Sequence, residues 1–103
     1  MLSWSLLESL AAECLVVGSA TPPVEEVLRH GENGLLVDFF DVDGWASTIA
    51  RTLAKPKAYT ELRKTARREI LKTYDLRSIC LPRQLKLIEA LANRANAEVL
   101  AAI

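Results

Sequence analysis

Near the start of the chain, Ser5 and Glu8 have the types and the spacing of residues that can do chemistry at a helix N-terminus. In a capping box, the Ser5 hydroxyl would accept a hydrogen bond from a backbone N–H, and Glu8 would bond back to the N–H of Ser5. The same end of a helix carries unpaired N–H groups and the positive end of the dipole, so the amides of Ser5, Leu6 and Leu7 can hold a phosphate. Glu8 would then lie one turn inside, where a carboxylate can accept from a ribose diol. On spacing alone, the capping box is the simpler interpretation.

Other nucleophilic or metal-binding residue types are few. Cys14 and Cys80 lie in apolar stretches without CxxC spacing, which favours buried, reduced thiols over a disulfide or a zinc site. His30 precedes Gly31 at an expected helix end, where an imidazole can cap carbonyl groups. A Cys–His nucleophilic pair is the weaker alternative. We therefore expect no metal ion.

The composition is that of an ordinary soluble domain. The 103 residues are 50% hydrophobic and 25% charged, which excludes a disordered chain and fits a single domain spanning residues 1–103. The formal net charge is zero, yet residues 1–54 are acidic and residues 55–86 are basic, which is typical of two solvated faces of opposite sign. Neither a membrane-spanning stretch nor the basic start of a signal peptide is present in the sequence, so we expect a cytoplasmic protein.

The middle of the first half predicts a strand, a helix and a second strand. The apolar run 14–18 indicates a buried strand, and residues 24–30 show helical spacing after Pro23. The turn 31–34 contains glycine and asparagine, which supply left-handed backbone, and residues 35–37 form the next buried strand. Two strands joined by one helix must run parallel in a Rossmann-like βαβ unit. Ser19 and Thr21 follow the first strand, at the edge where open α/β sheets bind ligands.

Three or so helices follow this unit. Asp41 can cap a helix that ends before Pro56, with an apolar stripe on one face: Val42, Trp45, Ala46, Ile49 and Leu53. A second stripe predicts a basic, mainly solvated helix: Ala58, Leu62, Ala66, Ile70 and Tyr74. Asp75 begins the last helical region and Pro82 marks a restart or kink. Beyond it, apolar residues recur in steps of three and four: Leu81, Leu85, Ile88, Ala92, Ala95 and Val99.

A parallel sheet of two strands leaves unpaired edges, although parallel sheets are normally larger and covered on both faces. We therefore expect the chain to be the tail of a longer protein, or to be completed by a second copy. A homodimer could form through the open strand edges or the last helix.

Four segments, in order and spacing, carry a family resemblance: SLLESLAA from Ser5, CLVVGS from Cys14, PVEEVL from Pro23 and HGENGLLVD from His30. Together they resemble the nucleotide-sugar-binding C-terminal domain of group 1 (family 4) retaining glycosyltransferases, which have the GT-B fold. The resemblance extends from Ser3 to about Leu91, and the tail from Tyr74 to Leu85 looks like the final helices of the family. It implies that the chain is an incomplete GT-B C-terminal domain and lacks the N-terminal acceptor domain.

The resemblance implies a sugar-donor site that is only partly present. Glu8 matches the second of two family glutamates, which contacts the ribose, whereas the first would fall immediately before Met1. Family glycines align with Met1 and Ser3, and Glu13 stands at a helix C-cap where the family commonly has glycine. Ser5, Leu6 and Leu7 would bind the diphosphate of a UDP- or GDP-linked sugar, and Ser19 and Thr21 would lie at the ligand edge beside it. Glu26 matches a family glutamate to which the resemblance assigns no role. No metal or other cofactor is implied.

Two other functions fit parts of the sequence. The first is a non-enzymatic, self-associating α/β binding module without nucleotide affinity. The second is a phosphate-binding α/β protein of the response-regulator or epimerase kind, which the absence of an acidic pair, GxGxxG and Tyr-x-x-x-Lys disfavours. The basic helix lacks interleaved aromatic residues, so we expect no nucleic-acid partner.

Overall fold

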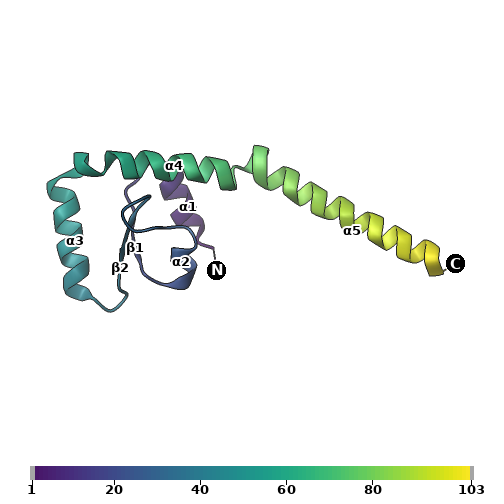
Figure 1. The fold of residues 1–103 in the computed structure, drawn as a ribbon, viewed down its shortest axis with the longest axis horizontal. Coiled ribbons are helices and arrows are strands. Elements are labelled where there is room, and N and C mark those ends of the chain that lie inside the picture. Colours follow the sequence, from purple (N-terminus) through teal and green to yellow (C-terminus); the bar gives the residue numbers. More distant parts are fainter. Residues whose placement is uncertain (1, 103) are drawn as a thin grey trace. The chain divides into compact units, whose positions relative to one another are not determined.

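The computed structural model describes residues 2–102, except the side chains of Val99, Leu100 and Ala102. Their contacts divide the chain into two compact units, residues 1–71 and 72–103. The first contains the following elements, of which the last ends beyond its boundary: α1 (Trp4–Ala11), β1 (Val17–Ser19), α2 (Pro22–Glu25), β2 (Leu35–Val37), α3 (Val42–Ala54), the 3₁₀ helix η1 (Pro56–Tyr59) and α4 (Thr60–Tyr74) (Figure 1). The second contains the π-helical segment η2 (Leu76–Cys80) and α5 (Leu81–Ala102). The single domain spanning residues 1–103 stays a prediction.

The predicted α/β class with a short parallel sheet is confirmed. β1 and β2 pair in parallel, with Val17 opposite Leu35 and Ser19 opposite Val37. The second strand has the predicted bounds, but the first begins three residues later than the apolar run 14–18. The reason is local, because the Cys14 N–H donates to the Ser9 carbonyl at 3.0 Å and so belongs to the end of α1.

The core of the first unit collects side chains from both halves of its sequence. Its buried apolar residues come from α1, the segment after α2, β2 and α4: Leu7, Leu10, Val27, Leu28, Leu35, Val37, Ala66 and Ile70. Leu28 packs so tightly that a Cβ added at Gly18 or Gly34 would lie 2.9 or 2.8 Å from its methyl groups. Glycine at these two positions therefore lets Leu28 cover the strands.

Helix α2 is much shorter than the predicted helix 24–30. It starts at Pro22, two residues before that range, and ends at Glu25. Asn33 explains the early end: its Oδ1 accepts from the Arg29 N–H at 2.7 Å, and its Nδ2 donates to the Val27 carbonyl at 2.9 Å. A side chain thus takes backbone groups that a longer helix would have used. The expected left-handed backbone occurs at Gly31 (φ 78°) but not at Asn33.

Helix α3 is capped as predicted, since Asp41 accepts from the Gly44 N–H at 2.9 Å. The orientation predicted from its apolar stripe is wrong: Val42 is 76% and Leu53 75% exposed, whereas Thr48 and Thr52 are buried. The Thr52 hydroxyl donates to the Ile49 carbonyl at 2.9 Å, so its burial leaves no polar group unpaired.

Helix α4 follows its predicted stripe more closely. Ala66 and Ile70 are buried, Leu62 and Tyr74 are half-buried, and Ala58 falls in η1 and is exposed. Not every basic residue is merely solvated. Arg63 Nε donates to the Glu13 carbonyl at 2.9 Å, and Arg67 donates to the Ala11 carbonyl. These two arginines, four residues apart, satisfy the carbonyl end of α1.

In the second unit, Asp75 caps η2 as expected. Its carboxylate accepts from the Ser78 N–H at 2.9 Å and from the Ser78 hydroxyl at 2.7 Å. Pro82 lies in the first turn of α5, where a missing N–H costs nothing, so the predicted restart is confirmed. Leu81, Leu85 and Ile88 are exposed, and Val99 lies outside the described side chains. None of the described helices is long and apolar enough to cross a membrane.

Candidate functional site at the start of α1

The cap of α1 is Ser3, and the prediction of Ser5 as the cap is wrong. Ser3 has extended backbone (φ −92°, ψ 117°), and its hydroxyl accepts from the Leu6 N–H at 3.3 Å. Ser5 lies in the first turn, with its hydroxyl 3.1 Å from that of Ser3. Because the helix starts at Trp4, Glu8 lies past the third helical position and cannot complete a capping box.

The three predicted phosphate-binding amides differ in their partners. The Leu7 N–H donates to the Ser3 carbonyl at 3.2 Å, which is the first bond of the helix itself. The Leu6 N–H makes the long bond to the Ser3 hydroxyl. No partner for the Ser5 N–H is found among residues 2–102. The Ser5 N–H can thus bind an anion directly. The Leu6 N–H can do so if it gives up its long bond to the Ser3 hydroxyl.

Glu8 lies one turn beyond these amides and is exposed. Within the described part of the chain, its carboxylate forms neither a hydrogen bond nor an ion pair. A carboxylate in this state can accept hydrogen bonds from a hydroxyl-bearing ligand without first breaking an internal contact.

Ser19 and Thr21 stand at the carboxyl end of β1, and their hydroxyls are 3.2 Å apart. Thr21 is the N-cap residue of α2 but makes no capping bond with its side chain, so both hydroxyls bond within the loop. A short connection, residues 12–16, joins α1 to β1. A helix in an α/β unit runs antiparallel to the strand that follows it, so we expect the start of α1 at the same end of the sheet as these hydroxyls.

The cysteines and the histidine do not behave as predicted. Cys14 is exposed and Cys80 half-buried, and both are free, so the expected burial of both thiols is wrong. His30 does not cap carbonyl groups: its Nδ1 accepts from the Leu36 N–H at 2.9 Å and thereby closes the outer edge of β2. Among residues 2–102, no three His, Cys, Asp or Glu side chains lie close enough together to hold a metal ion.

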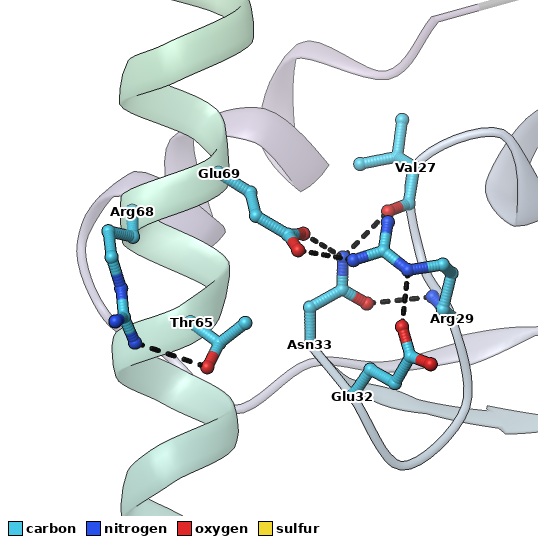
Figure 2. A network of polar contacts seen from close by, with 7 residues as sticks. All are labelled: Val27, Arg29, Glu32, Asn33, Thr65, Arg68 and Glu69. Atoms are coloured by element: carbon cyan, nitrogen blue, oxygen red, sulfur yellow. Dashed lines mark hydrogen bonds and ion pairs between the residues drawn. The ribbon is translucent and has the colours of Figure 1, made fainter.

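A polar network that sequence reasoning missed holds the loop after α2 against α4 (Figure 2). Asn33 Nδ2 donates to Glu69 at 2.8 Å, while Arg29 pairs with Glu69 and, at 2.6 Å, with Glu32. Hydrogen bonds from Arg29 to Glu32 and Glu69 raise the pKa of its guanidinium. The pairing of Arg29 with Glu69 is hidden by their separation of 40 residues in the sequence. The one detectable signal is Asn33 in the turn Gly31-Glu32-Asn33-Gly34, because an asparagine in a turn often bonds to the backbone.

Comparison with known proteins gives one finding. The family model described as "Glycosyl transferases group 1" matches residues 2–69, which include α1, both strands, α3 and most of α4. No curated protein and no solved structure matches the chain significantly. The match contains all four segments on which the resemblance was based, but it ends before the tail that looks like the last helices of the family. Glu26, the unassigned family position, is the exposed C-cap residue of α2.

Proposed function

Since this chain belongs to the group 1 glycosyl transferases, with more than half of its residues covered by the family model, we propose that it is the nucleotide-sugar-binding part of a retaining glycosyltransferase of the GT-B fold. The intact enzyme would transfer a sugar from a nucleoside diphosphate to an acceptor hydroxyl, with an N-terminal domain that binds the acceptor. The incomplete two-stranded sheet supports this proposal, because such a sheet normally has further strands.

The observation that carries the proposal is the exposed carboxylate of Glu8, one turn beyond the start of α1, which has no partner among the described residues. We assign the ribose contact to Glu8 and the diphosphate contacts to the amides of Ser5 and Leu6. Leu7 supports the site by its helical bond to Ser3 rather than by binding phosphate. Ser19 and Thr21 provide further hydroxyls at the same end of the sheet.

This arrangement would assist the reaction through electrostatics. Negative charge grows on the diphosphate as the bond to the sugar breaks. Fixed amides and the positive end of the α1 dipole stabilise that charge more in the transition state than in the bound substrate. The hydroxyls of Ser3 and Ser5, 3.1 Å apart, flank these amides and can donate to the same oxygens.

A second candidate function is a non-enzymatic module that associates with itself. It is favoured by exposed apolar side chains on α3 and α5, among them Val42, Leu53 and Ile88. Such a module would sediment as a dimer and would bind no nucleotide. The two functions are separated by measuring sedimentation and nucleotide affinity on the same preparation.

Titrating UDP and GDP by calorimetry against the wild type and Glu8→Ala tests the proposed sugar-donor site. Hydrogen bonds to a charged group contribute about 1.5–3 kcal/mol, so Glu8→Ala should weaken binding by about ten- to a hundredfold. Glu89→Ala, an exposed glutamate on α5, is the matched control and should bind like the wild type. If neither nucleotide binds the wild type, or if both variants bind equally well, the proposed site is wrong.

A further inference from the structure

A cavity of about 470 Å³ opens at the opposite end of α1 from the proposed sugar-donor site. The helix is eight residues long, so roughly 12 Å separate its two ends. The cavity is formed by the segment after α1, the end of α3, η1 and α4, and the lining residues that matter here are Glu13, Cys14, Leu15, Leu53, Pro56 and Arg63. Its volume lies within the range of small-molecule sites.

Part of the wall is apolar and open to solvent. Leu53 is 75% exposed even though it lines the cavity, and Leu15 is only half-buried. With Pro56 they offer an apolar surface that a ligand could cover. Removing such apolar surface from water is favourable, so an apolar ligand body belongs here.

The cavity also presents two opposite charges that do not pair with each other. Arg63 uses its Nε to donate to the backbone carbonyl of Glu13 at 2.9 Å. Among the described residues, no carboxylate lies within 4.0 Å of the Arg63 guanidinium, and no basic nitrogen lies within that distance of the Glu13 carboxylate. Arg63 can therefore receive a carboxylate on its free N–H groups, and Glu13 can receive an ammonium group.

Glu13 is held at this place against its backbone preference. Its φ of 61° is left-handed, and it is the one non-glycine residue with positive φ among residues 2–102. The Glu13 N–H donates to Leu10 and the Cys14 N–H to Ser9, the bonds of a Schellman motif, in which glycine normally occupies this position. Strained backbone positions of this kind cluster at ligand sites, where the contact that the side chain makes with a ligand can compensate for the backbone strain.

From these features we propose that the cavity binds a small zwitterion with an apolar body, namely an α-amino acid with an apolar side chain. Its carboxylate pairs with Arg63, its ammonium group pairs with Glu13, and its side chain packs on Leu15, Leu53 and Pro56. The proposal does not depend on sugar transfer, because the cavity and the proposed sugar-donor site share no residue.

The Cys14 thiol, exposed and part of the cavity wall, supplies a direct measurement. The intact 103-residue chain is treated with iodoacetamide, and alkylation of Cys14 is followed by mass spectrometry at increasing concentrations of L-phenylalanine. Cys80 does not line the cavity and serves as the internal reference. We expect L-phenylalanine to slow the alkylation of Cys14 and not that of Cys80.

Two analogues test the zwitterion itself: 3-phenylpropionate lacks the ammonium group, and 2-phenylethylamine lacks the carboxylate. Each should need at least about a tenfold higher concentration for half-protection, the loss expected for one charged contact. Protection by either analogue equal to that by L-phenylalanine would overturn the assignment. The same holds if saturating L-phenylalanine leaves the alkylation of Cys14 unchanged.

Variants separate binding from folding. Glu13→Gln should raise the half-protecting concentration of L-phenylalanine about tenfold, whereas Glu61→Gln, an exposed glutamate on α4, should not change it. Glu13→Gly removes the carboxylate from a position that glycine suits, so a folding defect cannot explain a loss of protection. Protection that persists unchanged in both Glu13 variants would contradict the inference.

Discussion

At the scale of single residues, polar side chains that bind backbone groups decide where the first two helices begin and end. Asn33 was expected to supply left-handed backbone, but its amide instead ends α2 and reaches α4 through Glu69. Ser3 displaces Ser5 as the cap because the helix begins two residues earlier than the Ser–Glu spacing suggests. Residue type predicted neither contact, and only the fold shows which backbone groups Asn33 and Ser3 bind.

Replacing Asn33 by alanine should destabilise the first unit by about 2–4 kcal/mol, because the part-buried Arg29 N–H and the buried Val27 carbonyl would both lose their partner. Urea unfolding followed by tryptophan fluorescence measures this, since Trp4 and Trp45 both belong to the first unit. Ser47→Ala, at an exposed position of α3, should stay within about 0.5 kcal/mol of the wild type. Equal stability of the two variants would show that the network contributes little.

Glu13→Gly should stabilise the chain, in contrast to most substitutions. The left-handed φ of 61° costs an L-residue with a side chain on the order of 1 kcal/mol, and glycine is free of that cost. Glycine also gains freedom in the unfolded chain, which offsets about 0.4–1 kcal/mol of this, so the net gain in chemical denaturation should be a few tenths of a kcal/mol. A decrease in stability would mean that the Glu13 side chain makes a stabilising contact in the absence of ligand.

At the scale of elements, the spacing of apolar residues predicts the buried face of a helix correctly when that face is apolar, and wrongly when it contains threonine. The stripe of α4 gave the correct buried residues Ala66 and Ile70. In α3 the most apolar face is exposed, and the buried face contains Thr48 and Thr52. Threonine can bond its hydroxyl within the helix and pack its methyl group, so a hydropathy pattern undervalues it. Burial of that face depends on neighbours that the helical sequence does not contain.

The cap of η2 should make the second unit sensitive to acid. Hydrogen bonds from the hydroxyl and the N–H of Ser78 lower the pKa of Asp75 below its ordinary value of 3.8. Because the folded-state pKa is the lower one, the cap stabilises fully above the ordinary pKa and is lost as the pH falls through the lowered value. An NMR titration should show the Ser78 amide signal shifting over this acid range, with Asp75→Asn insensitive. An identical acid-induced shift in Asp75→Asn would assign the effect to another group.

At the scale of the whole molecule, the order of helices and strands could be predicted because each of them depends mainly on the residues of its own segment. Apolar runs, prolines and glycines mark strands and helix ends wherever the chain goes. The proposed sugar-donor site stays a proposal, and what the fold adds is that Glu8 is exposed one turn into α1. The arginines that cap the end of α1, and the cavity at that end, could not be predicted from the sequence. Both depend on contacts between α4 and a loop some 50 positions earlier in the chain.

The two edges of the sheet differ in whether a further strand could pair with them. His30 covers the outer N–H of Leu36 and so protects β2 from further pairing, whereas β1 has no second partner strand among the described residues. Proteins usually protect edges that must stay free. The unprotected edge of β1 is therefore the side on which additional strands of a larger sheet would pair.

This asymmetry supports a last prediction, that the 103-residue chain alone transfers no sugar. Retaining transfer requires the anomeric carbon of the bound sugar and an acceptor hydroxyl to be held together, and positioning of two reactants accounts for about 7–11 kcal/mol of a typical barrier. The proposed site offers contacts to the nucleotide and none that we can assign to an acceptor. Incubation with UDP- and GDP-linked sugars and a panel of hydroxyl acceptors should give no glycosylated product by mass spectrometry, with an intact group 1 enzyme as the positive control. Product formation by the isolated chain would show that the described residues already contain both halves of the reaction.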